Sequence, residues 1–403
     1  MRLSHTPDMK HALLFFCALF LASCVGPTNS LAIPAPLSEH PQGWSQPASV
    51  KFAHIFSFNG SNGKEPAATL IDVNGTLYGT TYAGGANNDG TVFELEASGS
   101  QTLLHSFKGG RDGALPLAGL TDVGGTLYGT TVNGGGPSGE GVVFKLSSSG
   151  GGERVLHHFG MVGDGANPYA QLINVHGTLY GTTAGGGTNS EGTIFTVSRS
   201  GKTNVLYSFN PAKGDGATPV AELLNVNGAL YGTTAYGGSN CGTVGCGAVF
   251  KITTGGSESV LYSFNGGNDG ANPSAPLVDV RGTLYGTTAY GGKYGDGTVF
   301  KISTSGKESV LYNFQAGSDG AVPQSLALLN GTLYGTTSYG GSKNFGTVFS
   351  ITTAGKESVI YTFKGAADGA TPRAGLVASG GTLYGTTAAG GGNQDGTVFS
   401  ITP

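Results

Sequence analysis

Gly75 to Thr81 reads G-T-L-Y-G-T-T, and this seven-residue string decides the fold because it returns at nearly constant spacing to the end of the chain. It occurs seven times, once with Ala229 in place of the first threonine. Its tyrosines are Tyr78, Tyr128, Tyr180, Tyr231, Tyr285, Tyr334 and Tyr384, so the successive gaps are 50, 52, 51, 54, 49 and 50 residues. A period near 50 with several strand-like runs in each unit is typical of a repeat architecture.

One unit, residues 260–304, illustrates the pattern of strands. It contains an aromatic run V-L-Y-S-F, a short apolar run at 276–280, the string T-L-Y-G-T-T, and the run G-T-V-F-K-I at 297–302. The second and third runs are joined by two residues, which are Asn-Gly in several other copies, and this pair favours a tight turn that needs positive φ. Four short antiparallel strands in about 50 residues predict one propeller blade.

Seven copies predict an all-β, seven-bladed β-propeller. The array begins with the aromatic run at 51–58 and ends with the fourth type of run at 397–401. We therefore expect the N-terminal strand to complete the C-terminal blade and to close the ring, which removes exposed sheet edges.

The repeats resemble the GloVer repeat of bacterial secreted and anchored proteins and, more distantly, kelch repeats. The resemblance covers residues 51–403 and rests on G-T-L-Y-G-T-T and G-T-V-F, whereas the tryptophan that kelch repeats usually carry is missing. It implies a propeller of unassigned activity.

The N-terminal residues are predicted to contain a targeting signal. Arg2 and Lys10 precede an apolar run at 12–22, which is too short to span a membrane and is typical of an export signal. The string Leu-Ala-Ser before Cys24 resembles the lipobox of bacterial lipoproteins, although a plain signal peptide cut nearby is the alternative. We predict a signal peptide at 1–23, a lipid-anchored flexible tether at 24–50 and the propeller at 51–403. By resemblance to bacterial lipoproteins, Val25 after the predicted acylation site favours the outer membrane or cell surface of a Gram-negative bacterium.

Composition excludes some classes of function. The chain of 403 residues has 74 glycines, 11% charged residues and a net charge of −4. Its 20 lysines and arginines are spread thinly over the repeats, so we expect no nucleic-acid binding. No calcium loop, zinc-protease helix, phosphate loop or nucleophile elbow is present, and we expect no cofactor and no metal.

An aspartate opens an Asp-Gly-Ala-x-Pro string in six units. Either these residues cap their own turns, or they form a ring of carboxylates at the channel mouth. Their repetition in nearly every blade favours the structural role. The six are Asp112, Asp164, Asp215, Asp269, Asp319 and Asp368.

Other candidates break the symmetry of the repeat. His105 and His157 stand where other units have tyrosine, and we interpret them as aromatic substitutes rather than ligands. Cys241 and Cys246 lie in an insertion of the fourth unit, where export favours a local disulfide.

Tyrosines precede Gly-Gly after the repeated string in three consecutive units. They are Tyr236, Tyr290 and Tyr339, and Tyr82 is offset by one position in the first unit. Loops of this type lie on one propeller face, so these rings predict an arc around one mouth, where rigid amphipathic rings suit a sugar or peptide. Packing on neighbouring glycine loops is the alternative.

Two functions are therefore open. The first is a non-catalytic surface or periplasmic module that recognises a glycan or a protein through the tyrosine-bearing face, held to the membrane only by its lipid anchor. The second is a polysaccharide-active hydrolase or lyase that uses carboxylates at the channel mouth. The sequence favours the non-enzymatic alternative, because no unit shows a convincing carboxylate where the others are neutral.

Overall fold

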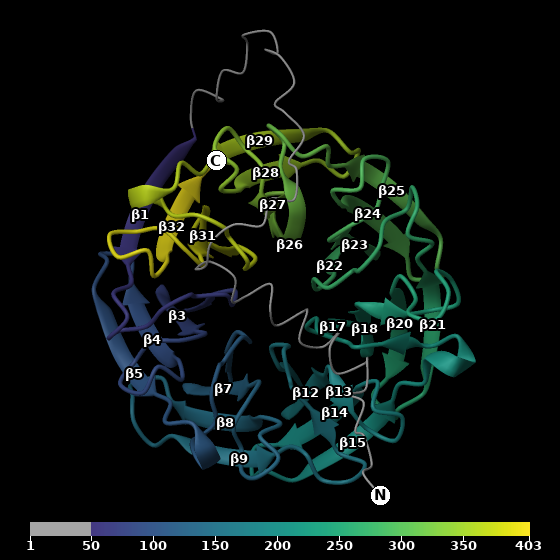
Figure 1. Ribbon diagram of the computed structural model, residues 1–403, viewed down its shortest axis with the longest axis horizontal. Helices are drawn as coiled ribbons and strands as arrows, with labels where there is room; N and C mark the ends of the chain where they lie inside the picture. Colours follow the sequence, from purple (N-terminus) through teal and green to yellow (C-terminus); the bar gives the residue numbers. More distant parts are fainter. Residues whose placement is uncertain (1–49) are drawn as a thin grey trace, which may run out of the picture. The chain divides into compact units, whose positions relative to one another are not determined.

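The computed structural model describes residues 50–403, and Cys24 and the predicted signal peptide and tether lie outside them. The described residues form a ring of seven four-stranded antiparallel sheets (Figure 1). Within this part of the chain, no helix is long and apolar enough to cross a membrane.

Each blade runs from a short innermost strand to an outer aromatic strand. Blades 1 and 2 contain β2 (Ile71–Val73), β3 (Thr76–Thr81), β4 (Thr91–Glu96), β5 (Gln101–Ser106), and β6 (Thr121–Asp122), β7 (Thr126–Thr131), β8 (Val142–Ser147), β9 (Arg154–His158). Blades 3 and 4 contain β11 (Ile173–Val175), β12 (Thr178–Thr183), β14 (Thr193–Ser198), β15 (Thr203–Ser208), and β17 (Leu224–Val226), β18 (Ala229–Thr234), β20 (Ala248–Thr253), β21 (Glu258–Ser263).

The remaining blades follow the same order. Blades 5 and 6 contain β22 (Val278–Val280), β23 (Thr283–Thr288), β24 (Thr298–Ser303), β25 (Glu308–Asn313), and β26 (Ala321–Leu329), β27 (Thr332–Tyr339), β28 (Thr347–Ile351), β29 (Glu357–Thr362). Blade 7 contains β30 (Val377–Ser379), β31 (Thr382–Thr387), β32 (Thr397–Thr402) and β1 (Lys51–Ser57). Short 3₁₀ turns η1 (Gly110–Asp112), η2 (Pro211–Lys213) and η3 (Ala366–Asp368) lie in three of the connections between blades.

The chain ends close the ring as predicted. Strand β1 pairs antiparallel with β32, from Lys51 opposite Thr402 to Ser57 opposite Thr397. Figure 1 shows the purple β1 along the outer edge of the yellow C-terminal blade. The expected strand order, with the aromatic strand outermost, is therefore confirmed.

The repeated string is explained by packing between blades. Gly286 of the blade 5 copy leaves room for its neighbours, because a Cβ there would lie 2.6 Å from the ring of Phe300 and 2.8 Å from Leu277. The hydroxyl of Thr287 donates to the backbone oxygen of Gln324 in the next blade at 3.0 Å. Thr287 thus serves the joint between sheets and Gly286 leaves room for buried core residues, whereas Thr288 bonds within its own blade, to the backbone oxygen of Tyr290 at 3.0 Å.

The core is divided among the joints between adjacent blades. One cluster combines Tyr231 and Phe264 of blade 4 with Leu284 and Phe300 of blade 5, and all four are buried. Because each cluster spans two blades, no blade buries its apolar faces alone, and the ring gains its stability from neighbour contacts.

A second contact between blades is made by the segments that connect one blade to the next, each of which bonds to the blade that it leaves. The residue before proline in every Asp-Gly-Ala-x-Pro string, or its equivalent, has a left-handed backbone, as at Val322 with φ 56°. The N–H of Val322 donates to the backbone oxygen of Asp296 in blade 5 at 3.0 Å. Gly297 lies against the following proline, since a Cβ there would be 2.6 Å from Cδ of Pro323. The sequence showed these strings as turns and did not reveal this contact between blades.

Candidate binding face

The loops that follow the repeated string lie on one face of the propeller. In blade 4 this loop pairs with the incoming connection through two short strands, β16 (Gly216–Ala217) and β19 (Tyr236–Gly237), and blade 3 repeats the arrangement with β10 (Gly165–Ala166) and β13 (Gly185–Gly186). Tyr236 pairs with Ala217, and Tyr290 and Tyr339 make the equivalent pairs in blades 5 and 6. The three predicted tyrosines therefore occupy matching backbone positions in consecutive blades.

Exposed apolar side chains gather on the same loops. Tyr290 and Tyr294 in blade 5 are each 46% exposed, Val244 in blade 4 is 48% exposed and Phe345 in blade 6 is 38% exposed. Lys293 lies with its ammonium nitrogen 5.0 Å from the centre of the Tyr294 ring. Tyr236 and Tyr339 are half-buried in the same loops. Sequence reasoning found the tyrosines before Gly-Gly but missed Tyr294 and Phe345, which stand further along loops of variable sequence.

Tyr82 lies apart from this group. It belongs to blade 1, and blade 7, with Ala389 at the matching position, separates it from Tyr339. Its N–H donates to the backbone oxygen of Glu65, and burial followed by the nearby Glu65 carboxylate raises the pKa of its phenol. The structure thus brings three of the four predicted tyrosines into one run of blades.

The six aspartates of the Asp-Gly-Ala-x-Pro strings point toward the outer strands and not toward the channel. Asp269 shows the arrangement, because its Oδ2 accepts from the backbone N–H of Asn265 at 2.9 Å and from the hydroxyl of Tyr262 at 2.8 Å. The others make the same bond to the outer-strand tyrosine or to His105 or His157. The alternative of a carboxylate ring at the channel mouth has no support in this geometry.

Three glutamates approach these aspartates from the next blade. Each begins an outer strand, has an Oε1 that is buried without a hydrogen-bond partner, and faces the tyrosine–aspartate pair of the preceding blade. Burial, and then repulsion from the aspartate, raises the pKa of each to about 7. They are Glu258, Glu308 and Glu357.

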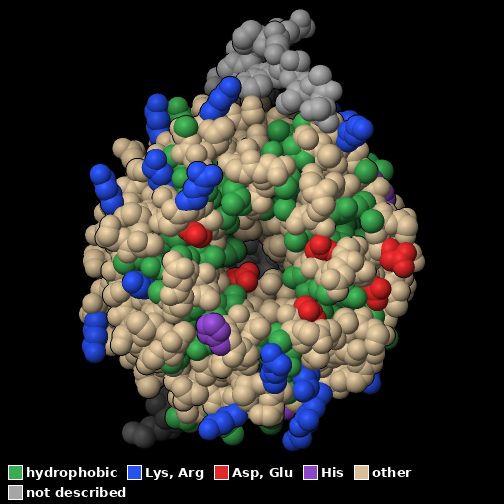
Figure 2. Space-filling model, turned by 180° about the vertical axis from the view of Figure 1, so that it is seen from behind, with side chains coloured by type: hydrophobic (Ala, Val, Ile, Leu, Met, Phe, Trp, Pro, Cys, Tyr) green, Lys and Arg blue, Asp and Glu red, His purple; other side chains and the backbone are tan. Residues whose placement is uncertain are grey.

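Sequence reasoning missed a buried carboxyl next to an innermost strand, at a position where the other blades are neutral. Glu222 stands two residues before β17, the innermost strand of blade 4, where the other blades have Thr69, Gly119, Gln171, Pro276, Ser325 and Gly375. Its side chain keeps some exposure, but protein surrounds it, and burial raises its pKa to about 8. Figure 2 shows the molecule hollowed at its centre, with acidic and hydrophobic side chains near the hollow and most basic ones farther out.

Two further features are a disulfide, which lies in the loop that carries Tyr236, and a hollow at the innermost strands. Cys241 and Cys246 form a disulfide with Cα atoms 5.6 Å apart, in the loop of blade 4. A shallow hollow of about 430 Å³ lies between the innermost strands of blades 1 and 2, lined by Asp72, Asp122 and Gln171 among others.

Comparison with known proteins gives a family and a fold. The sequence profile of a family described as the Gloeobacter/Verrucomicrobia repeat matches residues 45–245 and 239–403. A comparison with curated proteins gives no match.

Solved structures with similar folds include a puromycin-hydrolysing peptidase of Mycobacterium tuberculosis (12% identity, TM-score 0.51, covering 81% of this chain and 50% of that one). Another is an acylaminoacyl peptidase of Pyrococcus horikoshii (10% identity, TM-score 0.49, covering 85% and 52%). The chain spans about half the length of these two peptidases, and at such identity the likeness concerns the fold alone.

Proposed function

Because the chain belongs to the Gloeobacter/Verrucomicrobia repeat family and is a seven-bladed propeller, we propose that it is a non-catalytic binding module that recognises a glycan or a protein. The recognition surface in this proposal is the loop face of blades 4 to 6, centred on Tyr236, Tyr290 and Tyr339. The observation that carries the proposal is the exposure of Tyr290, Tyr294 and Phe345 in the loops of blades 5 and 6.

Physical chemistry supports this choice of surface. The strands and turns of the seven blades are nearly interchangeable, so a ligand that distinguishes one part of the ring must contact residues that differ. Tyr290 and Tyr294 are large rings held on short loops of a rigid scaffold, so little conformational entropy is lost when a ligand packs on them. Lys293 beside Tyr294 adds a positive charge to this area.

The experiment is a screen of the purified full chain against glycan and peptide arrays, beside a variant with Tyr236, Tyr290 and Tyr339 replaced by alanine. A control variant carries Tyr82→Ala, since Tyr82 lies in another part of the ring. We expect ligands that bind the wild type and the control but not the triple variant. Equal binding by all three proteins would contradict the proposed surface.

The proposal includes a cellular location for the protein. We propose that Cys24 is acylated after removal of residues 1–23 and that the module is held at the outer membrane or cell surface. A Cys24→Ser variant should lose labelling by a clickable fatty acid and leave the membrane fraction. Unchanged labelling and fractionation would contradict this part.

One observation favours the polysaccharide-active enzyme as a second candidate. Glu222 is a carboxyl beside the innermost strand of blade 4 whose pKa of about 8 keeps it protonated at neutral pH, as a general acid requires. Glycoside hydrolysis generally uses a second carboxylate, and the matching positions of the other blades are neutral. A reducing-end assay on a panel of polysaccharides, with Glu222→Gln as the inactive control, decides between the two candidates.

A further inference from the structure

Three matching positions of the repeat lie at the outer edge of the joints between adjacent blades. The first is the aromatic position of the outer strand, the second lies in the connection that leaves this strand, and the third lies at the start of the next blade's outer strand. In order around the ring the sets are His105, Asp112, Glu153; His157, Asp164, Thr203; Tyr207, Asp215, Glu258; Tyr262, Asp269, Glu308; Tyr312, Asp319, Glu357; Tyr361, Asp368, Phe52; and Phe56, Asn62, Gln101.

Only the joint between blades 1 and 2 combines an imidazole with two carboxylates. Nε2 of His105 lies 3.2 Å from Oδ2 of Asp112, and the ligand atoms of these residues and Glu153 all lie within 4.8 Å of one another. The side chains of His105 and Asp112 are only 15% and 19% exposed, and Oε1 of Glu153 is buried without a hydrogen-bond partner. Among the described residues, no other group of three or more His, Cys, Asp or Glu side chains converges so closely.

The geometry points to a binding site for a divalent transition-metal ion of the Zn²⁺ type, held by His105, Asp112 and Glu153 between blades 1 and 2. One imidazole nitrogen and two carboxylate oxygens form a donor set that zinc accepts, and three protein ligands leave a fourth position for water. Metal–ligand distances of about 2.0–2.2 Å place neighbouring donor atoms roughly 3.3 Å apart in a tetrahedron. The His105–Asp112 distance already fits, and the ligand atom of Glu153, within 4.8 Å of the other two, has to approach by at most about 1.5 Å.

The site also has an electrostatic reason to attract a cation. Two carboxylates approach each other here across a joint of low exposure, and the charge of Lys108, which acts on Glu153, sits on an exposed side chain. The backbone N–H of Lys108 donates to Oδ2 of Asp112 at 2.8 Å, which orients this carboxylate toward His105. A bound divalent ion would neutralise both carboxylates and link the two blades.

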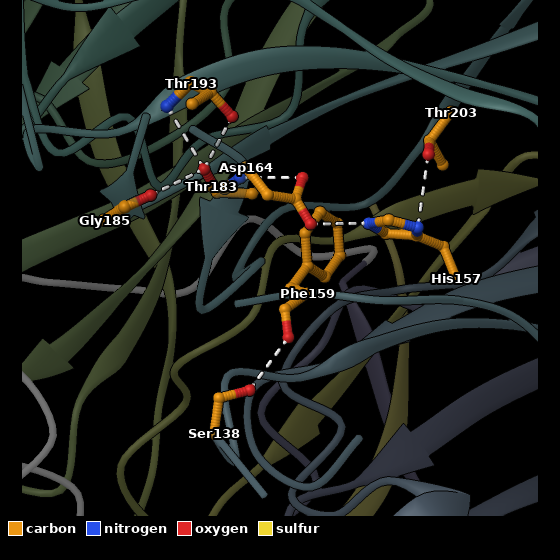
Figure 3. A network of polar contacts seen from close by, with 9 residues as sticks. Ser138, His157, Phe159, Asp164, Thr183, Gly185, Thr193 and Thr203 are labelled. Carbon is orange, nitrogen blue, oxygen red and sulfur yellow. Dashed lines mark hydrogen bonds and ion pairs between the residues drawn. The ribbon is translucent and has the colours of Figure 1, made fainter. Parts of the chain in front are cut away.

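The neighbouring joint provides a natural comparison. Figure 3 shows the ring of His157 between Asp164 and Thr203, with Nε2 2.8 Å from Asp164 Oδ2 and Nδ1 3.2 Å from the threonine hydroxyl. This joint has the same imidazole and aspartate but lacks the second carboxylate. The next three joints retain both carboxylates but carry tyrosine, a far rarer ligand of zinc than histidine.

The test uses variants that copy sets already present in the same ring. His105→Tyr reproduces the joint between blades 3 and 4, and Glu153→Thr reproduces the joint between blades 2 and 3, so both should fold. The full chain and the two variants are stripped with a chelator and titrated with Zn²⁺ by calorimetry, and bound zinc is measured by elemental analysis. Histidines and cysteines elsewhere in the chain are present in all three proteins, so the comparison between proteins isolates this joint.

We expect the wild type to bind one more equivalent of zinc than either variant, or to bind it with an affinity at least tenfold higher, since even an outer-shell partner contributes about 10–100-fold. Zinc should also raise the melting temperature of the wild type more than that of the variants. A Thr203→Glu variant completes the same set beside His157, and a gained equivalent would support the assignment directly. Equal zinc stoichiometry and affinity in the wild type, His105→Tyr and Glu153→Thr would overturn it.

Discussion

The ring of Phe52 stacks on the ring of Tyr361, with centroids 3.9 Å apart and planes 2° apart. Phe52 belongs to the N-terminal strand β1 of blade 7, and Tyr361 belongs to the outer strand of blade 6. Phe52 takes the place that Glu258 and its equivalents occupy at other joints. At this joint, which the N-terminal strand helps to form, an aromatic contact thus replaces the glutamate, while Asp368 keeps its bond to Tyr361.

We predict that Phe52→Ala lowers the free energy of unfolding by about 2 kcal/mol. Truncation of a fully buried aromatic costs about 3–5 kcal/mol, and Phe52 is only partly buried, although an aromatic pair adds about 0.5–1.5 kcal/mol. Phe52→Tyr keeps the stack and serves as the control. Urea unfolding of the three proteins gives the values, and a Phe52→Ala protein as stable as the wild type would contradict the role of this contact.

Deletion of residues 51–59 should have a far larger effect on stability. It removes ladder hydrogen bonds of about 1 kcal/mol each and the fully buried Phe58, which is worth about 1.5–3 kcal/mol. The sum is comparable with a typical stability margin of about 5–15 kcal/mol. Deletion of residues 26–45, which precede the described structure, should cost almost nothing, so equal melting of the two deletion variants would refute strand closure.

The glutamates at three joints predict a stability that depends on pH. Their carboxyls have a pKa near 4.5 in the unfolded chain and about 7 in the folded protein. Between these values the folded protein holds protons that the unfolded chain has lost, so the free energy of unfolding falls as pH rises from about 4.5 to 7 and levels off above. Partial exposure limits the loss to about 1 kcal/mol for each of Glu258, Glu308 and Glu357.

Replacement of all three by glutamine, which mimics the protonated carboxyl, should remove most of this slope. Melting temperatures measured from about pH 5 to 8 in buffers of equal ionic strength test it. The wild type should lose stability across this range relative to the triple variant. Parallel curves for the two proteins would mean that the carboxyls titrate normally.

The left-handed residues before proline predict a stabilising substitution. Val322 is β-branched and has φ 56°, a conformation that costs most side chains about 1–2 kcal/mol. Asn272 takes this position at the preceding joint and donates through Nδ2 to the backbone oxygen of Ala235 at 3.2 Å. Val322→Asn should therefore raise the free energy of unfolding by about 1 kcal/mol, and Asn272→Val should lower it by a similar amount. A destabilised Val322→Asn protein or a stabilised Asn272→Val protein in urea unfolding would contradict this explanation.

The disulfide predicts a local gain in stability. Closure of the short loop between Cys241 and Cys246 restricts the unfolded chain and is worth about 2 kcal/mol in the entropy model. Replacement of both cysteines by serine should cost about this amount, and reducing agent should lower the melting temperature of the wild type but not of the variant. Thiol titration of the unfolded, unreduced protein checks the bond, because reactivity of both cysteines would show that it does not form.

Much of the fold could be predicted because each blade repeats the same local rules. The Asn-Gly turns, the aromatic outer strand and the phase of the array were enough to predict seven blades and the pairing of β1 with β32. The contacts of Val322 and Gly297 between blades were not predictable, because they depend on the angle between neighbouring sheets and not on any pattern within one unit.

The candidate sites likewise include residues that the sequence could identify and residues that it could not. Tyr290 could be identified because its position carries tyrosine in three units and smaller residues in the others, and the cysteines could be paired because they lie five residues apart in one loop. His105 was interpreted as an aromatic substitute, since Glu153 lies in the next unit and only the register between blades brings the two together. Glu222 was missed because the segment before the innermost strand varies in every unit, so that one carboxylate there did not stand out.

The most direct measurement of the proposed function compares the wild type with Tyr290→Ala in both affinity and stability. Tyr290 is 46% exposed, so removal of its ring should change the melting temperature little. If the ring stacks on a ligand at the centre of the binding face, the variant should bind the array-selected ligand about 30-fold more weakly, which corresponds to about 2 kcal/mol. Unchanged affinity together with a lowered melting temperature would contradict the proposal and assign the ring to packing on its own loop.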